Sequence, residues 1–140
     1  MLIGVVTDNN ANGGWLHTRF LRSGSVVTSS NYYGSGASAY NASISYQSTA
    51  ADSFFRIVQL GTATERSSSF TMTIYNPLGT TKWKQASYYG WGHDGNTNGI
   101  YGTAGGGALQ DSTSAISGIN FYDSTSSSSL QMDIKLYGIK

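Results

Sequence analysis

The chain has 140 residues and no cysteine, and 11% of its residues are charged, against roughly 25% in ordinary soluble domains. This length fits one domain, expected over residues 1–140, with a core that needs no disulfide framework. A formal net charge of +1 without a basic stripe argues against a nucleic acid partner, and no apolar run approaches the roughly 18 residues of a membrane span, so membrane insertion is not expected.

The pattern of apolar and polar residues indicates an all-β protein. Nowhere do apolar residues recur at helical spacing over a dozen positions, whereas β-branched, aromatic and turn-forming residues dominate. Asn and Gly residues at 8–14 are typical of a tight reversal after the first strand. In the first half of the chain, strands are expected at 2–7, 15–21, 39–47, 54–60 and 68–76.

A long polar connection is expected between the second strand and residue 39. Residues 23–38 are rich in Gly and Ser and contain the segment Asn31-Tyr-Tyr-Gly-Ser-Gly36. A connection of this length is typical of a functional surface loop. Tyr32 and Tyr33 are therefore candidates for a ligand or partner surface.

Turn and glycine signals divide the middle of the chain. The segment Asn76-Pro-Leu-Gly79 predicts a turn, because Pro suits the second position of a β-turn. An aromatic-rich element at 81–91 follows, and after it a Gly-rich run at 92–107 with a short possible strand at Ile100-Tyr101. The glycines of this run are expected to allow positive φ angles or close backbone approach in a bend.

The two last strands are expected at 115–122 and 130–140. A hydroxyl-rich bridge at 123–129 is expected to join them as a hairpin loop or an outward bulge. With roughly eight or nine strands in all, the chain is expected to form a two-sheet antiparallel β-sandwich of jelly-roll-like form. The terminal strand should complete a sheet, because apolar residues alternate along it at Leu130, Met132, Ile134 and Leu136.

The aromatic segment 83–93 is the best candidate for a ligand or partner surface. Aromatic faces bury a large area at low entropic cost and can stack on sugar rings. On an alternating strand, however, half of the aromatic side chains must face the core, so packing in the core or in a subunit interface is the competing interpretation. The candidates here are Tyr88, Tyr89, Trp91 and His93.

Metal and nucleotide sites are weakly indicated. Asp94, Asn96 and Asn98 resemble the first half of a calcium loop, but Gly105 stands where a closing Glu would be needed, so an Asn/Gly-rich turn explains them better. The glycines at 102–107 lack the Lys-Ser/Thr pair of a phosphate loop. We therefore expect no metal and no cofactor.

Catalytic signals are also weak. The chain offers His17 and His93, seven carboxylates and many hydroxyls, but no Gly-x-Ser-x-Gly elbow. A serine triad can be imagined in any Ser-rich chain, so its parts alone carry no weight. We expect a protein that is not an enzyme.

Several motifs together resemble a family of bacteriophage virion proteins. In that family a Gly-rich stretch precedes an Ile-x-x-Ile-x-Phe strand, and an Ile/Leu-x-Leu-Tyr-Gly-Ile strand closes a jelly-roll-like domain. Leu16-His-Thr-Arg-Phe20, followed by the polar segment that contains Tyr32 and Tyr33, is similar to the family's early strand and loop. The C-terminal motifs are Tyr88-Tyr-Gly-Trp91, Gly102-Thr-Ala-Gly-Gly-Gly107, Ile116-Ser-Gly-Ile-Asn-Phe121 and Ile134-Lys-Leu-Tyr-Gly-Ile139.

The resemblance implies a non-enzymatic structural component of a virion, either tail-fibre or tail-associated or a capsid decoration. It implies self-association, with a homotrimer favoured, together with contacts to other virion proteins and possible contact with a host-surface glycan. The low charge also favours self-association, because it removes electrostatic repulsion between copies. The alternative function is a carbohydrate-binding module or lectin that uses exposed Tyr and Trp side chains.

Overall fold

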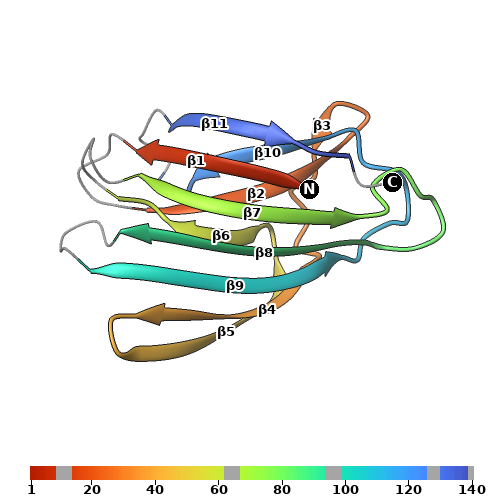
Figure 1. The fold of residues 1–140 in the computed structure, drawn as a ribbon. Coiled ribbons are helices and arrows are strands. Elements are labelled where there is room, and N and C mark those ends of the chain that lie inside the picture. Colours follow the sequence, from red (N-terminus) through yellow and green to blue (C-terminus); the bar gives the residue numbers. More distant parts are fainter. Residues whose placement is uncertain (9–13, 62–66, 94–98, 126–129, 139–140) are drawn as a thin grey trace.

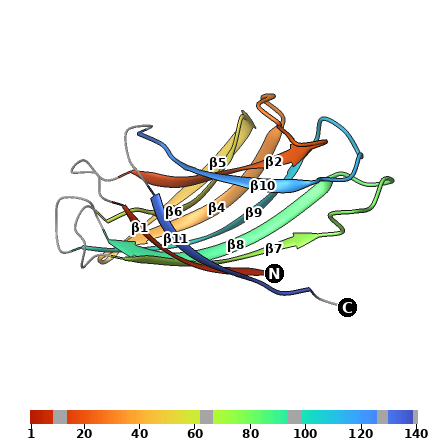
Figure 2. The same ribbon diagram turned by 90° about the horizontal axis from the view of Figure 1, so that it is seen from above.

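The computed structural model describes residues 1–8, 14–61, 67–93, 99–125 and 130–138. These residues form eleven β-strands and no helix, arranged as two antiparallel sheets that lie face to face (Figures 1 and 2). The prediction of an all-β, two-sheet antiparallel sandwich is confirmed. The strand count exceeds the expected eight or nine, since residues 23–38 contain a two-residue strand and most of a longer one.

The larger sheet has seven strands. A central group of long strands has a pair of shorter strands at one edge and a two-stranded hairpin at the other (Figure 1). Neighbouring strands run antiparallel throughout this sheet. The order is β11 (Leu130–Leu136), β1 (Leu2–Asp8), β7 (Ser68–Tyr75), β8 (Lys84–His93), β9 (Ile100–Leu109), β4 (Tyr32–Tyr40) and β5 (Ser43–Asp52).

The smaller sheet covers one face of the larger one. β2 (Trp15–Arg22) is its central strand, with β10 (Gly118–Asp123) alongside. The short β3 (Ser25–Val26) and β6 (Phe55–Gln59) pair with different parts of β2. Figure 2 shows β2 and β10 in one layer and β7 and β8 in the other.

Apolar side chains from the facing sides of the two sheets form one core. The hydroxyl of Tyr32 is part of it, since it accepts a hydrogen bond from the backbone N–H of Phe20 (2.9 Å) and donates one to the carbonyl of Val27 (3.1 Å). The buried cluster consists of Val6, Leu16, Phe20, Tyr32, Phe55, Ile57, Val58, Leu60, Phe70, Met72, Ala86, Leu109 and Ile116.

Besides the hydrogen bond between Phe20 and Tyr32, hydrogen bonds from two further hydroxyl groups join the layers directly. The Thr103 hydroxyl on β9 donates to the carbonyl of Ile57 on β6 (2.6 Å), and the Ser68 hydroxyl on β7 donates to the carbonyl of Gln59 (2.7 Å). Buried polar groups need such partners, since an unpaired buried hydroxyl is costly. β6 is therefore fixed above β7 and β9 by hydrogen bonds as well as by apolar packing.

The structure corrects two expectations about loops. Residues 23–38, predicted as a surface loop, contain β3 and the first part of β4. The Gly-rich run, predicted as a bend, contains β9, and its glycines provide close approach and not positive φ: among the described glycines, Gly24 is the one with positive φ. A Cβ on Gly105 would lie 2.8 Å from the Tyr88 hydroxyl, so the larger side chain on β8 occupies the space that a β9 side chain would need.

The terminal strand completes the larger sheet, as predicted, by pairing with β1. Its apolar face is buried at one end alone: Leu130 and Met132 pack against the core, whereas Leu136 is 75% exposed. Its predecessor β10 belongs to the other sheet, so β10 and β11 do not pair as a hairpin and the expected hairpin is wrong; residues 126–129 of the bridge lie outside the described residues. The predicted turn at 76–79 is confirmed by a hydrogen bond from the Gly79 N–H to the Asn76 carbonyl (3.2 Å).

Candidate binding surfaces

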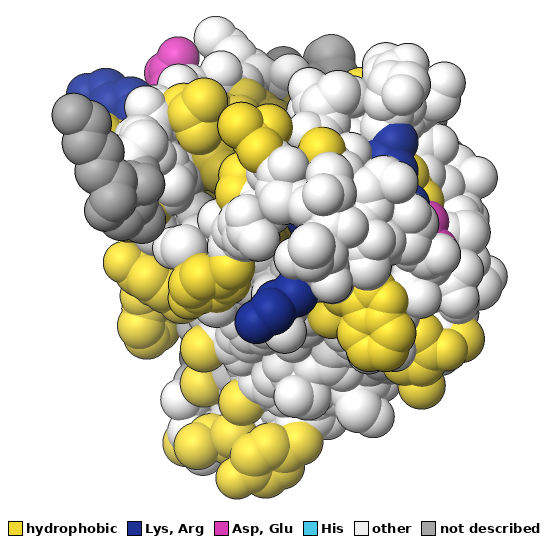
Figure 3. Space-filling view, turned by 90° about the vertical axis from the view of Figure 1, so that its right-hand side faces the viewer, with side chains coloured by type: hydrophobic (Ala, Val, Ile, Leu, Met, Phe, Trp, Pro, Cys, Tyr) yellow, Lys and Arg dark blue, Asp and Glu magenta, His cyan; other side chains and the backbone are white. Residues whose placement is uncertain are grey.

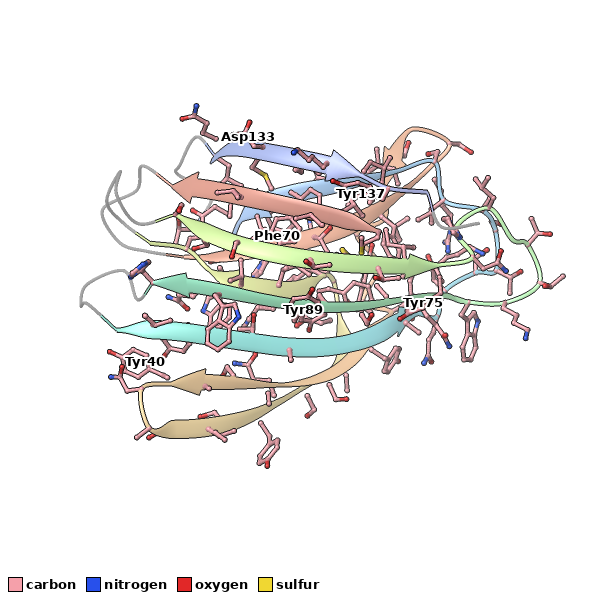
Figure 4. All side chains as sticks on the ribbon, viewed as in Figure 1. Tyr40, Phe70, Tyr75, Tyr89, Asp133 and Tyr137 are labelled. Carbon is pink, nitrogen blue, oxygen red and sulfur yellow. The ribbon has the colours of Figure 1, made fainter. Side chains whose placement is uncertain are left out.

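Strand β8 separates the candidate aromatic residues onto two faces. Tyr88 points toward the smaller sheet and is partly buried, while Tyr89 and Trp91 lie on the outer face and are 57% and 61% exposed. Figure 4 shows Tyr89 near the middle of the outer face of the larger sheet. The two interpretations of this segment therefore apply to different residues, with Tyr88 packed inside and Tyr89 and Trp91 available for contact.

The inward-facing tyrosines are structural. Tyr32, proposed as a loop residue that binds a partner, is fully buried, so that expectation is corrected. Burial raises the pKa of Tyr32 to about 12 and also raises the pKa of Tyr88. Tyr33, the next residue along β4, points outward and stays accessible. Of these three tyrosines, Tyr33 is the one that can meet a partner.

Cross-strand pairing aligns the outer-face side chains of the larger sheet in rows. One row runs from Ile3 across Tyr89 to Tyr46, and its neighbour runs from Val5 across Trp91 to Ile44. All six of these apolar side chains are more than a third exposed, Tyr46 at 88%. Between the β8 residues and the β5 residues the rows contain small residues: Ala104, Ala37, Gly102 and Ala39. Between β1 and β8 they contain the polar residues Thr71 and Ser69. We call these two rows the outer-face rows.

The outer-face rows place large side chains beside small ones. Trp91 lies across Gly102, where an added Cβ would come within 2.7 Å of the indole ring. The absence of a side chain there lets the ring lie against the sheet. The small residues of β9 and β4 separate Tyr89 and Trp91 from Ile44 and Tyr46 on β5.

A second exposed aromatic group lies where β7 ends and β8 begins. One row of cross-strand partners there consists of Tyr75, Gln85, Ala108 and Tyr33. Tyr75 and Tyr33 stand at the two ends of this row, three strand spacings or about 14 Å apart at the backbone. Figure 4 shows Tyr75 on the same sheet face as Tyr89, close to the end of β7.

Two open cavities meet at Tyr75 and Gln85. One, of about 610 Å³, lies over the row just described and is also lined by Ser35, Gly106 and Gln110. The other, of about 560 Å³, extends beyond Tyr75 to Trp83. We call the pair of cavities the end groove. Its remaining lining residues beside Trp83 are Asn76, Thr81, Lys82 and Thr113. The end of the molecule seen in Figure 3 carries separate hydrophobic groups with mostly uncharged surface between them.

The wall of the end groove is fixed from beneath by a buried lysine. The Lys84 side chain is fully buried, and its ammonium group donates hydrogen bonds to the backbone carbonyls of Gly79, Lys82 and Thr113. These carbonyls belong to the loop before β8 and to the segment before β10. Since an ammonium group has three protons to donate, this arrangement satisfies all of them without a carboxylate.

The end groove was missed in the sequence analysis. Trp83 falls inside the aromatic segment, and the alternation of 68–76 places Tyr75 on the face opposite Phe70, Met72 and Ile74, but neither residue is among the predicted site residues. The missing information was register: Tyr75 pairs with Gln85, and β9 and β4 complete the row from distant parts of the chain. The exposed Asn-Pro turn directly after Tyr75 was a signal that this strand end reaches the surface.

The two histidines do not form a catalytic pair. His17 is buried between Phe54, on which it stacks at 3.8 Å, and Tyr122. Burial, with the positive charge of Arg56 and despite Asp123, lowers its pKa to about 4, so the imidazole is neutral at physiological pH. His93 is half-buried at the end of β8. A neutral, enclosed His17 stabilises the core and is poorly suited to proton transfer.

The candidate calcium residues Asp94, Asn96 and Asn98 lie outside the described residues. Within the described part of the chain, no three His, Asp or Glu side chains gather in a way that could hold a metal ion. One ion pair is present there, between Arg22 and Asp111 at 2.6 Å.

Comparisons with known proteins give no match: no family model, no curated protein and no solved structure matches the chain. None of the described segments forms a helix of the length and apolarity needed to cross a membrane.

Proposed function

We propose that the chain is a non-enzymatic structural subunit of a bacteriophage virion, either tail-fibre or tail-associated or a capsid decoration. In this role it acts through protein–protein assembly and through contact with the host surface. The homotrimer implied by the sequence resemblance is the assembly we propose.

One observation carries the proposal: from β8 to β5 the two outer-face rows have apolar side chains or glycine at every position, on a protein that has few charges. Soluble monomers rarely expose large contiguous apolar patches, and such patches are typical of interaction sites. Self-association through this face would place Tyr89 and Trp91 of one copy against the small side chains of β9 and β4 of another. Aromatic side chains are the usual anchors of such contacts, because they lose little conformational entropy on binding.

The positions of the resemblance motifs support the same role. The glycine motif lies in β9, the Ile-x-x-Ile-x-Phe motif leads into β10, and the terminal motif lies in and after β11. These motifs build the two sheets and place no reactive groups together. Their positions are thus explained by packing within the sheets, as a structural subunit requires.

Mass spectrometry of density-purified particles tests this proposal. Peptides of the chain should copurify with the particle at a fixed ratio to the major capsid protein. Separation of heads from tails then decides between decoration and tail-associated roles. Absence of the chain from every particle fraction would contradict the proposal.

Carbohydrate recognition is the second candidate function, favoured by the half-exposed Tyr75 and Trp83 side chains and the amide groups between and beside them. A virion subunit that meets a host surface and a free-standing lectin would both use such a site. The two differ in what the chain is attached to, which the particle measurement decides.

A further inference from the structure

We infer that the end groove binds a neutral oligosaccharide of at least two sugar units. The inference rests on the proposed role in host-surface contact and names the ligand class of that contact. It assigns the site to Tyr33, Tyr75, Trp83 and Gln85, and not to Tyr89 and Trp91.

Three aromatic side chains from separate segments provide the apolar surfaces. Tyr33 comes from β4, Tyr75 from the end of β7 and Trp83 from the loop before β8, and Tyr75 and Trp83 are each about half exposed (51% and 50%). An aromatic ring offers a flat, rigid surface that matches the C–H face of a sugar ring. Tyr75 lies between the two cavities, so it can contact sugars on both sides.

The polar side chains of the groove suit sugar hydroxyls. Gln85 lies in both cavities, and Gln110 and Asn76 lie in one each. A carboxamide donates and accepts hydrogen bonds at once, as a hydroxyl does, so each can pair with a sugar hydroxyl in either direction. Thr81 and Thr113 add hydroxyl groups beside Trp83.

The charge of the groove favours a neutral ligand. Among the described residues that line the two cavities, Lys82 is the one ionised side chain and none carries a carboxylate. A nucleotide or an acidic polysaccharide would require a cluster of cations. A purely apolar ligand would leave the amide groups without partners, which costs affinity.

The groove is held in shape before a ligand arrives. The Lys84 ammonium group holds the loop that carries Trp83 and the segment that carries Thr113. The Ile116 N–H donates to the Pro77 carbonyl (3.0 Å), and the Tyr75 hydroxyl is hydrogen-bonded to Ser87 (3.0 Å). Preorganised walls reduce the entropy lost on binding, which a weak, multi-contact ligand such as an oligosaccharide needs.

The size of the groove sets the minimum ligand. Each cavity falls within the roughly 300–1,000 Å³ range of small-molecule sites. Since they meet at Tyr75, one ligand can occupy both in succession. We therefore expect a disaccharide or longer chain to bind more tightly than its monosaccharide.

The test uses the purified full chain on an array of neutral oligosaccharides (glucans, mannans, galactans) together with sialylated and uronate-containing ones. Titration calorimetry with the free oligosaccharide that binds best then gives an affinity without multivalent effects. We expect a neutral oligosaccharide to bind, and Tyr75→Ala, Trp83→Ala and Gln85→Ala each to weaken it on the order of tenfold. Tyr75→Phe, which keeps the ring, should retain most of the affinity.

A matched control lies outside both the groove and the outer-face rows. Tyr137→Ala removes another partly exposed tyrosine, which lines neither cavity of the groove, and should change the affinity less than about twofold. Circular dichroism and thermal melting check that each variant is folded. If one groove variant fails to fold, the other two still decide the result.

Three results would overturn the inference: no glycan bound by the wild-type chain, binding restricted to acidic glycans, or binding lost in Trp91→Ala and retained in the groove variants. These results are separable from the virion test. A chain found in particles but without glycan binding would overturn the groove alone, and a chain that binds glycan but is absent from particles would overturn the virion role alone.

Discussion

β9 and β11 belong to the same sheet but are stabilised in opposite ways. β9 is rich in glycine, yet β8 and β4 flank it on both sides and large side chains from its neighbours cover it. β11 has a regular apolar alternation, yet it is an edge strand whose last apolar residue is largely exposed. Position within the sheet, more than the side chains of a strand, determines how much that strand contributes.

A Leu→Ala substitution at the end of each strand should change the free energy of unfolding by very different amounts. Leu109 at the end of β9 is fully buried in the core, so Leu109→Ala should lower the free energy of unfolding by about 2–5 kcal/mol. Leu136 at the end of β11 is mostly exposed, and Leu136→Ala should change it by less than about 0.5 kcal/mol. Urea denaturation measures both, and equal losses would contradict the comparison.

Substitution of a glycine in β9 should cost less stability than Leu109→Ala. A Cβ on Gly107 would lie 2.2 Å from the Tyr33 carbonyl oxygen, so Gly107→Ala must displace backbone and should cost about 1–3 kcal/mol of stability. Gly118→Ala in β10 is the matched control, since its nearest neighbour would be 3.7 Å away. The control should leave the midpoint of unfolding nearly unchanged, and similar losses in both variants would show that close approach is not the reason for Gly107.

The hydroxyl of Tyr32, at the start of β4, should also contribute to stability. Tyr32→Phe keeps the ring but removes the acceptor for the Phe20 N–H. A buried N–H without a partner should cost about 1–3 kcal/mol, of which local water entry recovers a part. The free energy of unfolding measures this loss, and a variant as stable as the wild type would mean that the hydroxyl contributes nothing.

The smallest effect is a pH dependence in the other sheet. Because the pKa of His17 is lowered to about 4 in the folded chain from an ordinary 6.5, the unfolded chain binds a proton more readily between these values. Its contribution to stability is present above pH 6.5 and is lost as the pH falls toward 4. Between pH 6 and 5 the loss should be about 1 kcal/mol. His17→Phe should remove this part of the pH dependence in thermal melts, and an unchanged slope would contradict the assignment.

The fold class was predictable because alternation with a period of two is local. The same locality explains the errors. Ser and Gly around Tyr32 indicated a loop. In the structure β4 is a strand because it pairs with β5 and with the distant β9, and Tyr32 packs against Phe20 of the other sheet. The glycines of β9 are compatible with a strand because the Tyr88 and Trp91 side chains on β8 cover them, which no window of sequence contains.

The candidate site was predictable in part. Tyr89 and Trp91 were correctly placed in an aromatic segment, but the face of each residue depends on where the strand begins. Tyr75 and Gln85 become neighbours through the β7–β8 register, and Tyr33 joins them across two more strands. A surface built by register from four strands cannot be recognised before the sheet order is known.

The claim that the chain acts by assembly through its outer face has one direct test. Sedimentation velocity of the full chain should show an oligomer, with the trimer expected. Trp91→Lys, which places a charge in the middle of the outer-face rows, should sediment as a monomer with an unchanged circular dichroism spectrum. A wild-type chain that stays monomeric at high concentration, or a Trp91→Lys variant that assembles as the wild type does, would contradict the account.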